Sequence, residues 1–154
     1  MDSGDISSGS DVAVEFPNFI RVYKDGHVDR LTGTEIVPAG VDPSTGVSSK
    51  DVLIDPGTGV SARLFLPPTD EKEKEDEKKK LPVLVYFHGG GFIIETPFSP
   101  LYHAYLNSVA ARAQVVAVSV HYRRAPEHPL PAAYDDSWTA LRWVVVGGAG
   151  EPWL

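Results

Sequence analysis

The chain has 154 residues, a formal net charge of −7 and no cysteine. The acidic balance excludes an electrostatic grip on nucleic acid or on an anionic membrane, because both need positive charge facing phosphate. The lack of cysteine excludes a disulfide framework, a thiolate metal site and a cysteine nucleophile.

The start of the chain, from Met1 to Ser8, has neither a positive region nor a continuous apolar run, and the first arginine is Arg21. This pattern predicts no secretory signal and no organelle transit peptide. No apolar run reaches the roughly 18 residues that a membrane helix needs. We therefore expect a protein of the cytoplasm, with the nucleus as a second possibility, and no membrane span.

Residues 1–18 are small and acidic and are expected to form a mobile arm or lid, followed by one domain over 19–154. The arm and the start of the domain carry an apolar group made of Val14, Phe16 and Phe19. Alternation with a period of two then predicts two hairpins. The first joins 20–23 to 28–31 through Asp25-Gly26, a pair that tolerates positive φ in a tight turn. The second joins 50–54 to 60–66, and both are expected at the antiparallel edge of a mixed sheet.

Residues 70–80 are six acids and five lysines, and they are expected to form a solvated surface loop rather than a docking tail. The continuous apolar runs at 81–87 and 115–120 predict strands buried on both faces. Helical spacing predicts helices over about 100–113 and 131–146. Strand, helix and strand in this order make a βαβ unit, so the two strands should be parallel. The second helix is expected to bury a stripe of four residues: Tyr134, Trp138, Leu141 and Val145.

Three glycines, Gly89 to Gly91, follow His88 directly after the first buried strand. Backbone N–H groups can converge on an oxyanion only where no side chain blocks the approach, and glycine leaves that space open. Such donors stabilise the tetrahedral intermediate of acyl transfer, each by about 3–4 kcal/mol. A glycine triplet alone is more often a sharp loop, but the strand before it and the helix after it favour an oxyanion hole.

Three blocks, His88 to Phe92, Tyr122 to Pro129 and Pro131 to Asp136, together resemble the hormone-sensitive-lipase-like α/β-hydrolases. More closely, they resemble the plant carboxylesterase branch, which also contains the gibberellin receptors. The resemblance runs from about Phe19 to Leu154. It implies an α/β fold, namely the N-terminal half of an α/β-hydrolase.

The resemblance also assigns roles. It implies that the amides of Gly90 and Gly91 form the oxyanion hole, with Gly89 shaping the turn and His88 orienting the loop. The blocks after Tyr122 imply a structural corner, in which four charged residues act as scaffold: Arg123, Arg124, Glu127 and Asp136.

The chain departs from the family in one large respect. These enzymes use a Ser in G-x-S-x-G, then Asp or Glu, then His, and no G-x-S-x-G occurs here. All five histidines precede the position of the catalytic one. The sequence is therefore expected to stop one strand before the nucleophile and to be inactive alone. No cofactor is implied, and no histidine pair has metal-ligand spacing with a third ligand.

Four hypotheses remain open. The first is part of a carboxylesterase for a small ester with an apolar acyl or aryl group, contacted by Phe92 and covered by Val14, Phe16 and Phe19. The second is a hormone receptor without catalysis, although the family's receptors tend to carry Ser at the position of Gly91. The third is a dehydratase with Thr as nucleophile, and the fourth is an unstable fragment. The substrate and the oligomeric state are not determined by the sequence.

Overall fold

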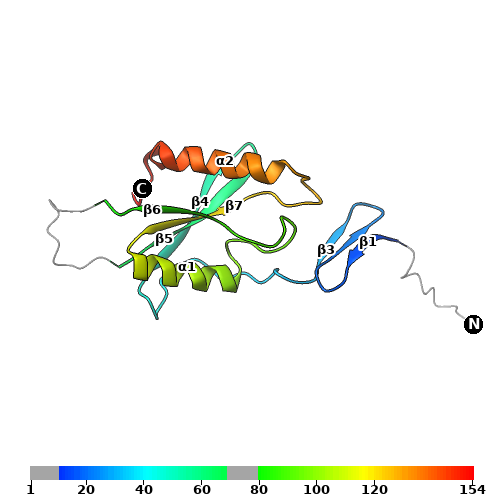
Figure 1. The fold of residues 1–154 in the computed structure, drawn as a ribbon, viewed down its shortest axis with the longest axis horizontal. Helices are drawn as coiled ribbons and strands as arrows, with labels where there is room; N and C mark the ends of the chain where they lie inside the picture. The colour runs from blue at the N-terminus through cyan, green and yellow to red at the C-terminus, as the bar shows by residue number, and fades with distance from the viewer. Residues whose placement is uncertain (1–10, 69–79) are drawn as a thin grey trace, which may run out of the picture.

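The computed structural model describes residues 11–68 and 80–154, which form two sheets, two α-helices and a short 3-10 helix, η2 (Gly148–Gly150) (Figure 1). The charged loop expected at 70–80 lies outside the described residues except for Lys80. The small sheet contains β1 (Val12–Phe16), β2 (Ile20–Tyr23) and β3 (Val28–Arg30). The strands of the main sheet are β4 (Ser48–Asp55), β5 (Val60–Leu66), β6 (Val83–Phe87) and β7 (Val116–His121).

The main sheet is mixed, as the sequence predicts, with the strand order β4-β5-β7-β6. β5 pairs antiparallel with both β4 and β7, and β6 is parallel to β7. The helix α1 (Pro100–Ala113) connects β6 to β7, which confirms the βαβ unit. Pro100 occupies the first helical turn, where its missing N–H costs nothing.

The two α-helices cover opposite faces of the main sheet (Figure 1). α1 packs beside Phe65 and Ala117 through its buried residues Leu106 and Ala110. α2 (Ala132–Val145) covers the other face, where Ala133 and Ala140 join Val60, Val120 and Tyr122. The core therefore lies on both sides of β5 and β7, the two central strands.

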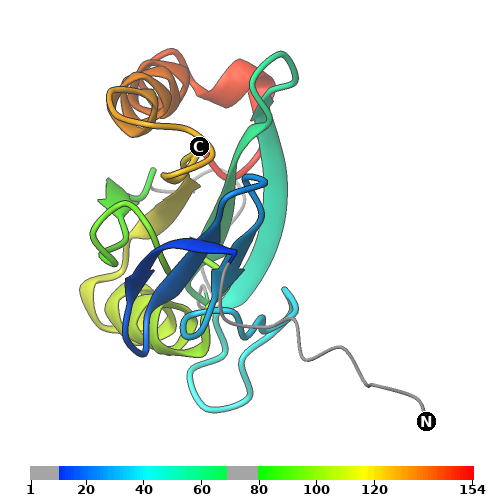
Figure 2. The same cartoon turned by 90° about the vertical axis from the view of Figure 1, so that its right-hand side faces the viewer.

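The first hairpin does not extend the main sheet, which corrects the expectation of a single mixed sheet. β2 pairs instead with β1 on one side and with β3 on the other. This small sheet lies beyond one end of the main sheet (Figure 1) and in front of it in Figure 2. Phe16 pairs with Ile20, so strand pairing crosses the boundary expected between an arm at 1–18 and a domain at 19–154. The apolar alternation of residues 12–16 predicts a strand, and these residues form β1.

Two predictions of burial are wrong. Val83 and Phe87 of β6 are each about 40% exposed, so this strand is only partly buried, whereas β7 is buried as predicted. α2 buries Ala133, Asp136 and Ala140, whereas Tyr134 and Trp138 of the predicted stripe are more than half exposed. No described helix is long and apolar enough to cross a membrane.

Candidate active site

The glycine loop lies between β6 and α1, at the carboxyl end of β6, where α/β sheets place their ligands. Its backbone is unusual, because Gly90, Gly91, Phe92 and Glu95 all have positive φ, at 111°, 62°, 63° and 69°. Phe92 and Glu95 carry side chains that disfavour this region of φ/ψ space. A loop that holds several such residues must be stabilised by the contacts around it.

The first of these contacts hold the peptide unit that joins His88 to Gly89. The hydroxyl of Tyr122, after β7, donates to the carbonyl oxygen of His88 at 2.6 Å. The N–H of Gly89 donates to the hydroxyl oxygen of Tyr102, on α1, at 3.0 Å. Burial raises the pKa of Tyr122 to about 12, so its hydroxyl keeps the proton that it donates. Two tyrosines from different elements therefore hold opposite ends of one peptide unit.

The next two peptide units are held through their carbonyl oxygens. His88 Nδ1 donates to Gly89 O at 2.7 Å, and the N–H groups of Ile93 and Ile94 donate to Gly90 O at 3.1 and 3.0 Å. The C=O and N–H of a trans peptide point in opposite directions. Because the carbonyls of Gly89 and Gly90 are held by their partners, the N–H groups of Gly90 and Gly91 point away from those partners.

The second half of the loop is held by three donors from elsewhere in the fold. Ala125 N–H donates to Phe92 O at 2.9 Å, Arg30 Nε donates to Ile93 O at 2.6 Å, and an Arg124 amino group donates to Glu95 O at 2.8 Å. The carbonyls of Phe92, Ile93 and Glu95 are thus occupied by partners. Within the part of the chain that the structure describes, the N–H groups of Gly90 and Gly91 donate to no acceptor.

His88 is neutral in this arrangement. Its side chain is 4% exposed and stacks on the Tyr122 ring with centroids 4.3 Å apart. Burial lowers its pKa to about 4. Because Gly89 O can only accept, Nδ1 carries the proton, and the unprotonated Nε2 is buried without a partner among the described residues. This arrangement suits a residue that orients the loop and does not suit a general base.

An apolar cavity of about 330 Å³ lies against the two glycines whose N–H groups have no acceptor. Apart from Gly90 and Gly91, its lining residues are Phe16, Phe19, Ile20, Ile93 and Ile94. Phe16 and Phe19 are more than half exposed, and they bring the small sheet to the glycine loop. The structure thus brings four of the predicted site residues together: Phe16, Phe19, Gly90 and Gly91.

The two other residues predicted to contact the substrate do not line the cavity. Val14 does not line this cavity, and the Phe92 ring packs against Tyr122 and Tyr134, with centroids 5.9 and 5.3 Å away. Sequence reasoning missed Ile93 and Ile94, which the apolar run after the glycines could have indicated. It also missed the contact of Tyr102 with Gly89, because Tyr102 fits a helical core stripe equally well.

The corner after β7 holds the charged residues expected to be scaffold. Arg123 forms an ion pair with Asp136 at 2.8 Å, and its backbone N–H donates to the same carboxylate at 2.8 Å. Glu127 binds Arg30 through both carboxylate oxygens, each at 2.7 Å. These contacts tie the corner to α2 and to the small sheet. No group of three possible metal ligands occurs in the described ranges 11–68 and 80–154.

Comparisons with known proteins agree with this fold. A family model for the alpha/beta hydrolase fold matches residues 84–151. Probable carboxylesterase 13 of Arabidopsis thaliana is 47% identical over 148 residues, which are 94% of this chain and 45% of that protein. The 2-hydroxyisoflavanone dehydratase of Glycyrrhiza echinata is 45% identical over 156 residues, covering 96% of this chain and 46% of the dehydratase. A Pyrobaculum calidifontis esterase structure is 33% identical with a TM-score of 0.53, covering 64% of this chain and 29% of the esterase.

The relatives cover the small sheet, the glycine loop and the corner in one continuous resemblance. The chain is therefore similar to the plant carboxylesterase branch of the hormone-sensitive-lipase-like α/β-hydrolases. This plant carboxylesterase-like chain spans about half the length of the curated relatives it matches. Its matched family segment contains most of β6, the glycine loop, both α-helices and β7.

Proposed function

We propose that this chain supplies the oxyanion hole and part of the acyl pocket of a carboxylic-ester hydrolase. The observation that carries the proposal is the pair of N–H groups of Gly90 and Gly91, which have no acceptor within the described residues and lie beside an apolar cavity. An ester carbonyl placed there would gain two hydrogen bonds as its oxygen becomes negative. Each such donor is worth about 3–4 kcal/mol of the barrier.

The substrate would be a small ester with an apolar acyl or aryl group. The cavity wall is made of aromatic and branched aliphatic side chains, which favour an apolar group over a charged one. Phe16 and Phe19 would cover that group from the small sheet, in the lid role expected for the N-terminal segment. Tyr102, Tyr122 and His88 would act as positioning residues that keep the two amides aimed at the carbonyl.

The nucleophile would come from a part of the enzyme that this chain does not contain. No G-x-S-x-G is present in the 154 residues. An oxyanion hole stabilises a charge that forms only after a nucleophile has attacked, so the chain alone would not turn over esters. We expect no nucleic-acid partner, and we place the protein in the cytoplasm or nucleus. A fluorescent fusion found in mitochondria or plastids would overturn that location.

The test uses a completed domain, in which residues 1–154 are joined to the part of Probable carboxylesterase 13 that follows its aligned region. We expect the completed domain to hydrolyse p-nitrophenyl butyrate and to lose this activity on treatment with a serine-directed phosphonate. We expect the 154-residue chain alone to match a heat-denatured control. A folded completed domain without activity, or turnover by the chain alone, would contradict the proposal.

A dehydratase is the second candidate, favoured by the 45% identity to 2-hydroxyisoflavanone dehydratase. In that case the same amides would stabilise negative charge on a carbonyl oxygen during loss of water. The discriminating experiment joins residues 1–154 to the corresponding part of the dehydratase and supplies 2-hydroxyisoflavanone. If the joined protein dehydrates 2-hydroxyisoflavanone at a rate close to that of the intact relative, residues 1–154 support the elimination. If the joined protein folds but does not dehydrate the substrate, the dehydratase function is excluded.

A further inference from the structure

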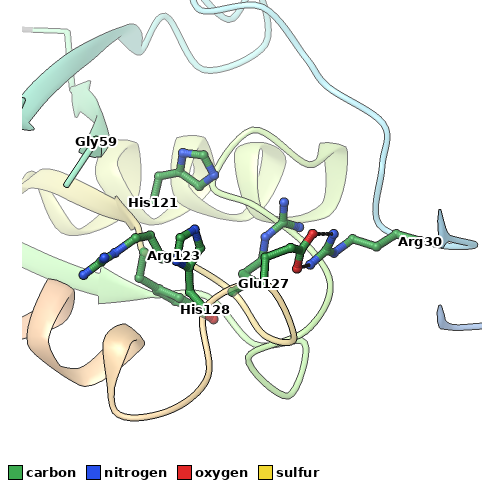
Figure 3. A pocket seen from close by; sticks show the side chains of 8 residues that line it. Arg30, Gly59, His121, Arg123, Glu127 and His128 are labelled. Carbon is green, nitrogen blue, oxygen red and sulfur yellow. Dashed lines mark hydrogen bonds and ion pairs between the residues drawn. The ribbon is translucent and has the colours of Figure 1, made fainter. Parts of the chain in front are cut away.

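A second pocket, of about 240 Å³, lies at the corner after β7 and shares no lining residue with the apolar cavity. Figure 3 shows His121 and His128 on one side of it and the pair of Arg30 with Glu127 on the other. The pocket is markedly basic, although the whole chain carries a net charge of −7. Its lining contains three arginines and two histidines against one carboxylate: Arg30, Arg123, Arg124, His121, His128 and Glu127.

Two of the three arginines are already neutralised. Arg30 binds Glu127 through two hydrogen bonds of 2.7 Å, and the pKa of Glu127 falls to about 2 because of these bonds. Arg123 is paired with Asp136, whose side chain is 2% exposed. These two ion pairs account for the structure of the corner, and neither leaves an excess of positive charge.

Arg124 is different. Its side chain is half-buried, and its hydrogen bond within the described residues goes to the backbone oxygen of Glu95, with no carboxylate at ion-pair distance. Burial, followed by the positive charge of Arg30, lowers its pKa. Glu127 and Glu95 act in the opposite direction, but neither forms an ion pair with Arg124. A partly desolvated guanidinium without a directly paired carboxylate is costly. It has five N–H donors in a fixed geometry, and most of them remain available to a ligand.

The two histidines add further donors beside Arg124. His121 Nδ1 lies 3.3 Å from the hydroxyl of Ser61, which leaves Nε2 available to the pocket. The edge contact of the His121 ring with Phe98, at 4.9 Å between centroids, holds the ring in place. The exposed imidazole of His128 has no hydrogen-bond or ion-pair partner in the described part of the chain.

We propose that this pocket binds a small tetrahedral oxyanion of the sulfate or phosphate class, held by Arg124 together with His121 and His128. The pocket offers a guanidinium and two imidazoles, and an imidazole becomes positively charged when it takes up a proton. These groups therefore favour a ligand with two negative charges over a carboxylate ligand with one. The site uses neither the glycine amides nor the apolar cavity, although Arg124 also donates to Glu95 O at the end of the glycine loop.

Binding is expected to strengthen as the pH falls. Without a ligand, burial and then the charge of Arg124 lower the pKa of His121, while Asp51 on β4 and Asp136 on α2 act in the opposite direction. A bound dianion stabilises the protonated imidazole and raises this pKa, so protonation and binding reinforce each other. Sulfate is the suitable probe, because its own charge does not change between pH 6 and pH 8.

The experiment is an NMR titration of the 154-residue chain with sodium sulfate, in which ionic strength is held constant with chloride. We expect saturable shifts of the His121 and His128 ring signals at pH 6, with weaker binding at pH 8 and weaker binding of acetate. His27, which pairs with Asp29 in the small sheet, is the internal reference and should not shift. Arg124→Gln should weaken sulfate binding at least about tenfold, the scale of one charged hydrogen bond.

Arg112→Gln is the matched control, because it removes the same charge from an exposed position in the last turn of α1. It should leave the affinity within about twofold of the native value. The proposal is overturned if no saturable shift occurs, or if Arg112→Gln and Arg124→Gln weaken binding equally. If Arg124→Gln does not fold, His128→Asn decides, since unchanged affinity in that variant would also reject the site.

Discussion

Gly90 and Gly91 differ in their tolerance for a side chain, although both are assigned to the oxyanion hole. A Cβ on Gly90 would collide with the backbone oxygen of Ile94, at a φ of +111° that disfavours any other residue. A Cβ on Gly91 would meet nothing within 4 Å. Gly90 is therefore required for the turn itself, whereas the space beside Gly91 belongs to the cavity.

Tyr102→Phe tests whether the first peptide unit of the loop must be held. The change removes the acceptor of the Gly89 N–H, so this unit can rotate and carry the following amides with it. In the completed domain we expect kcat to fall by roughly tenfold or more with little change in KM, because small displacements of catalytic groups are costly. Tyr105→Phe, on the exposed face of the same helix, should leave both values unchanged. Equal effects of the two variants would reject the positioning role.

The buried neutral state of His88 predicts a loss of stability in mild acid. The unfolded chain takes up the proton below pH 6.5, whereas the folded chain resists it until about pH 4. The free energy of unfolding should therefore decrease as pH falls through this window, by on the order of 3 kcal/mol for His88. Urea unfolding at several pH values measures the slope, and His88→Gln should reduce it. An unchanged slope would mean that His88 titrates normally in the folded chain.

At the scale of elements, Arg30 is a polar connection between the small sheet and the body. Its side chain is 12% exposed and donates to Ile93 O, Ala125 O and Glu127. Arg30→Met should lower hydrogen-exchange protection in residues 12–30 by about tenfold or more and leave β5 and β7 unaffected. Arg21→Met removes an arginine that pairs with Glu15 inside the small sheet, and it should have a smaller effect. Equal protection in both variants would show that Arg30 is not the connection.

The orientation of α2 depends on a buried charge. Asp136 accepts hydrogen bonds from the backbone and side chain of Arg123, which turns Ala133 and Ala140 toward the sheet and Trp138 toward solvent. Asp136→Asn should destabilise the fold by about 3 kcal/mol, because it leaves Arg123 without its counter-ion. Asp135→Asn changes an exposed neighbour and should cost less than about 0.5 kcal/mol. Thermal unfolding of the two variants measures the difference, and similar midpoints would contradict this account.

At the scale of the whole molecule, the sequence predicts the structure correctly where hydrophobic periodicity or the residues of a turn decide it. The bounds of α1, the parallel pair β6 and β7, and the turn at Asp25-Gly26 all follow from local pattern. The sequence does not predict the structure where contacts between residues far apart in the chain decide it. Nothing local to α2 reveals that Asp136 faces inward, and nothing local to β2 reveals that it pairs with β1 and not with β4.

The residues of the candidate site also fall into those that the sequence identified and those that it did not. The sequence identified the glycines and two of the phenylalanines, because both groups are conspicuous in composition. It did not identify the hydroxyl groups of Tyr102 and Tyr122 as partners of one peptide unit, since they come from positions 14 and 34 residues away from His88. The separate roles of Gly90 and Gly91 likewise depend on the neighbours that the fold brings to each of them.

The kcat/KM of Gly91→Ala in the completed domain tests the oxyanion-hole assignment most directly. Gly26→Ala is the matched control, because Gly26 also has positive φ and a Cβ there would meet no atom within 4 Å, but it lies in the hairpin turn between β2 and β3. We predict that Gly91→Ala lowers kcat/KM for p-nitrophenyl butyrate at least about tenfold, because the methyl group enters the space of the ester carbonyl. We predict that Gly26→Ala leaves it unchanged. Equal kcat/KM in the two variants would contradict the oxyanion-hole assignment.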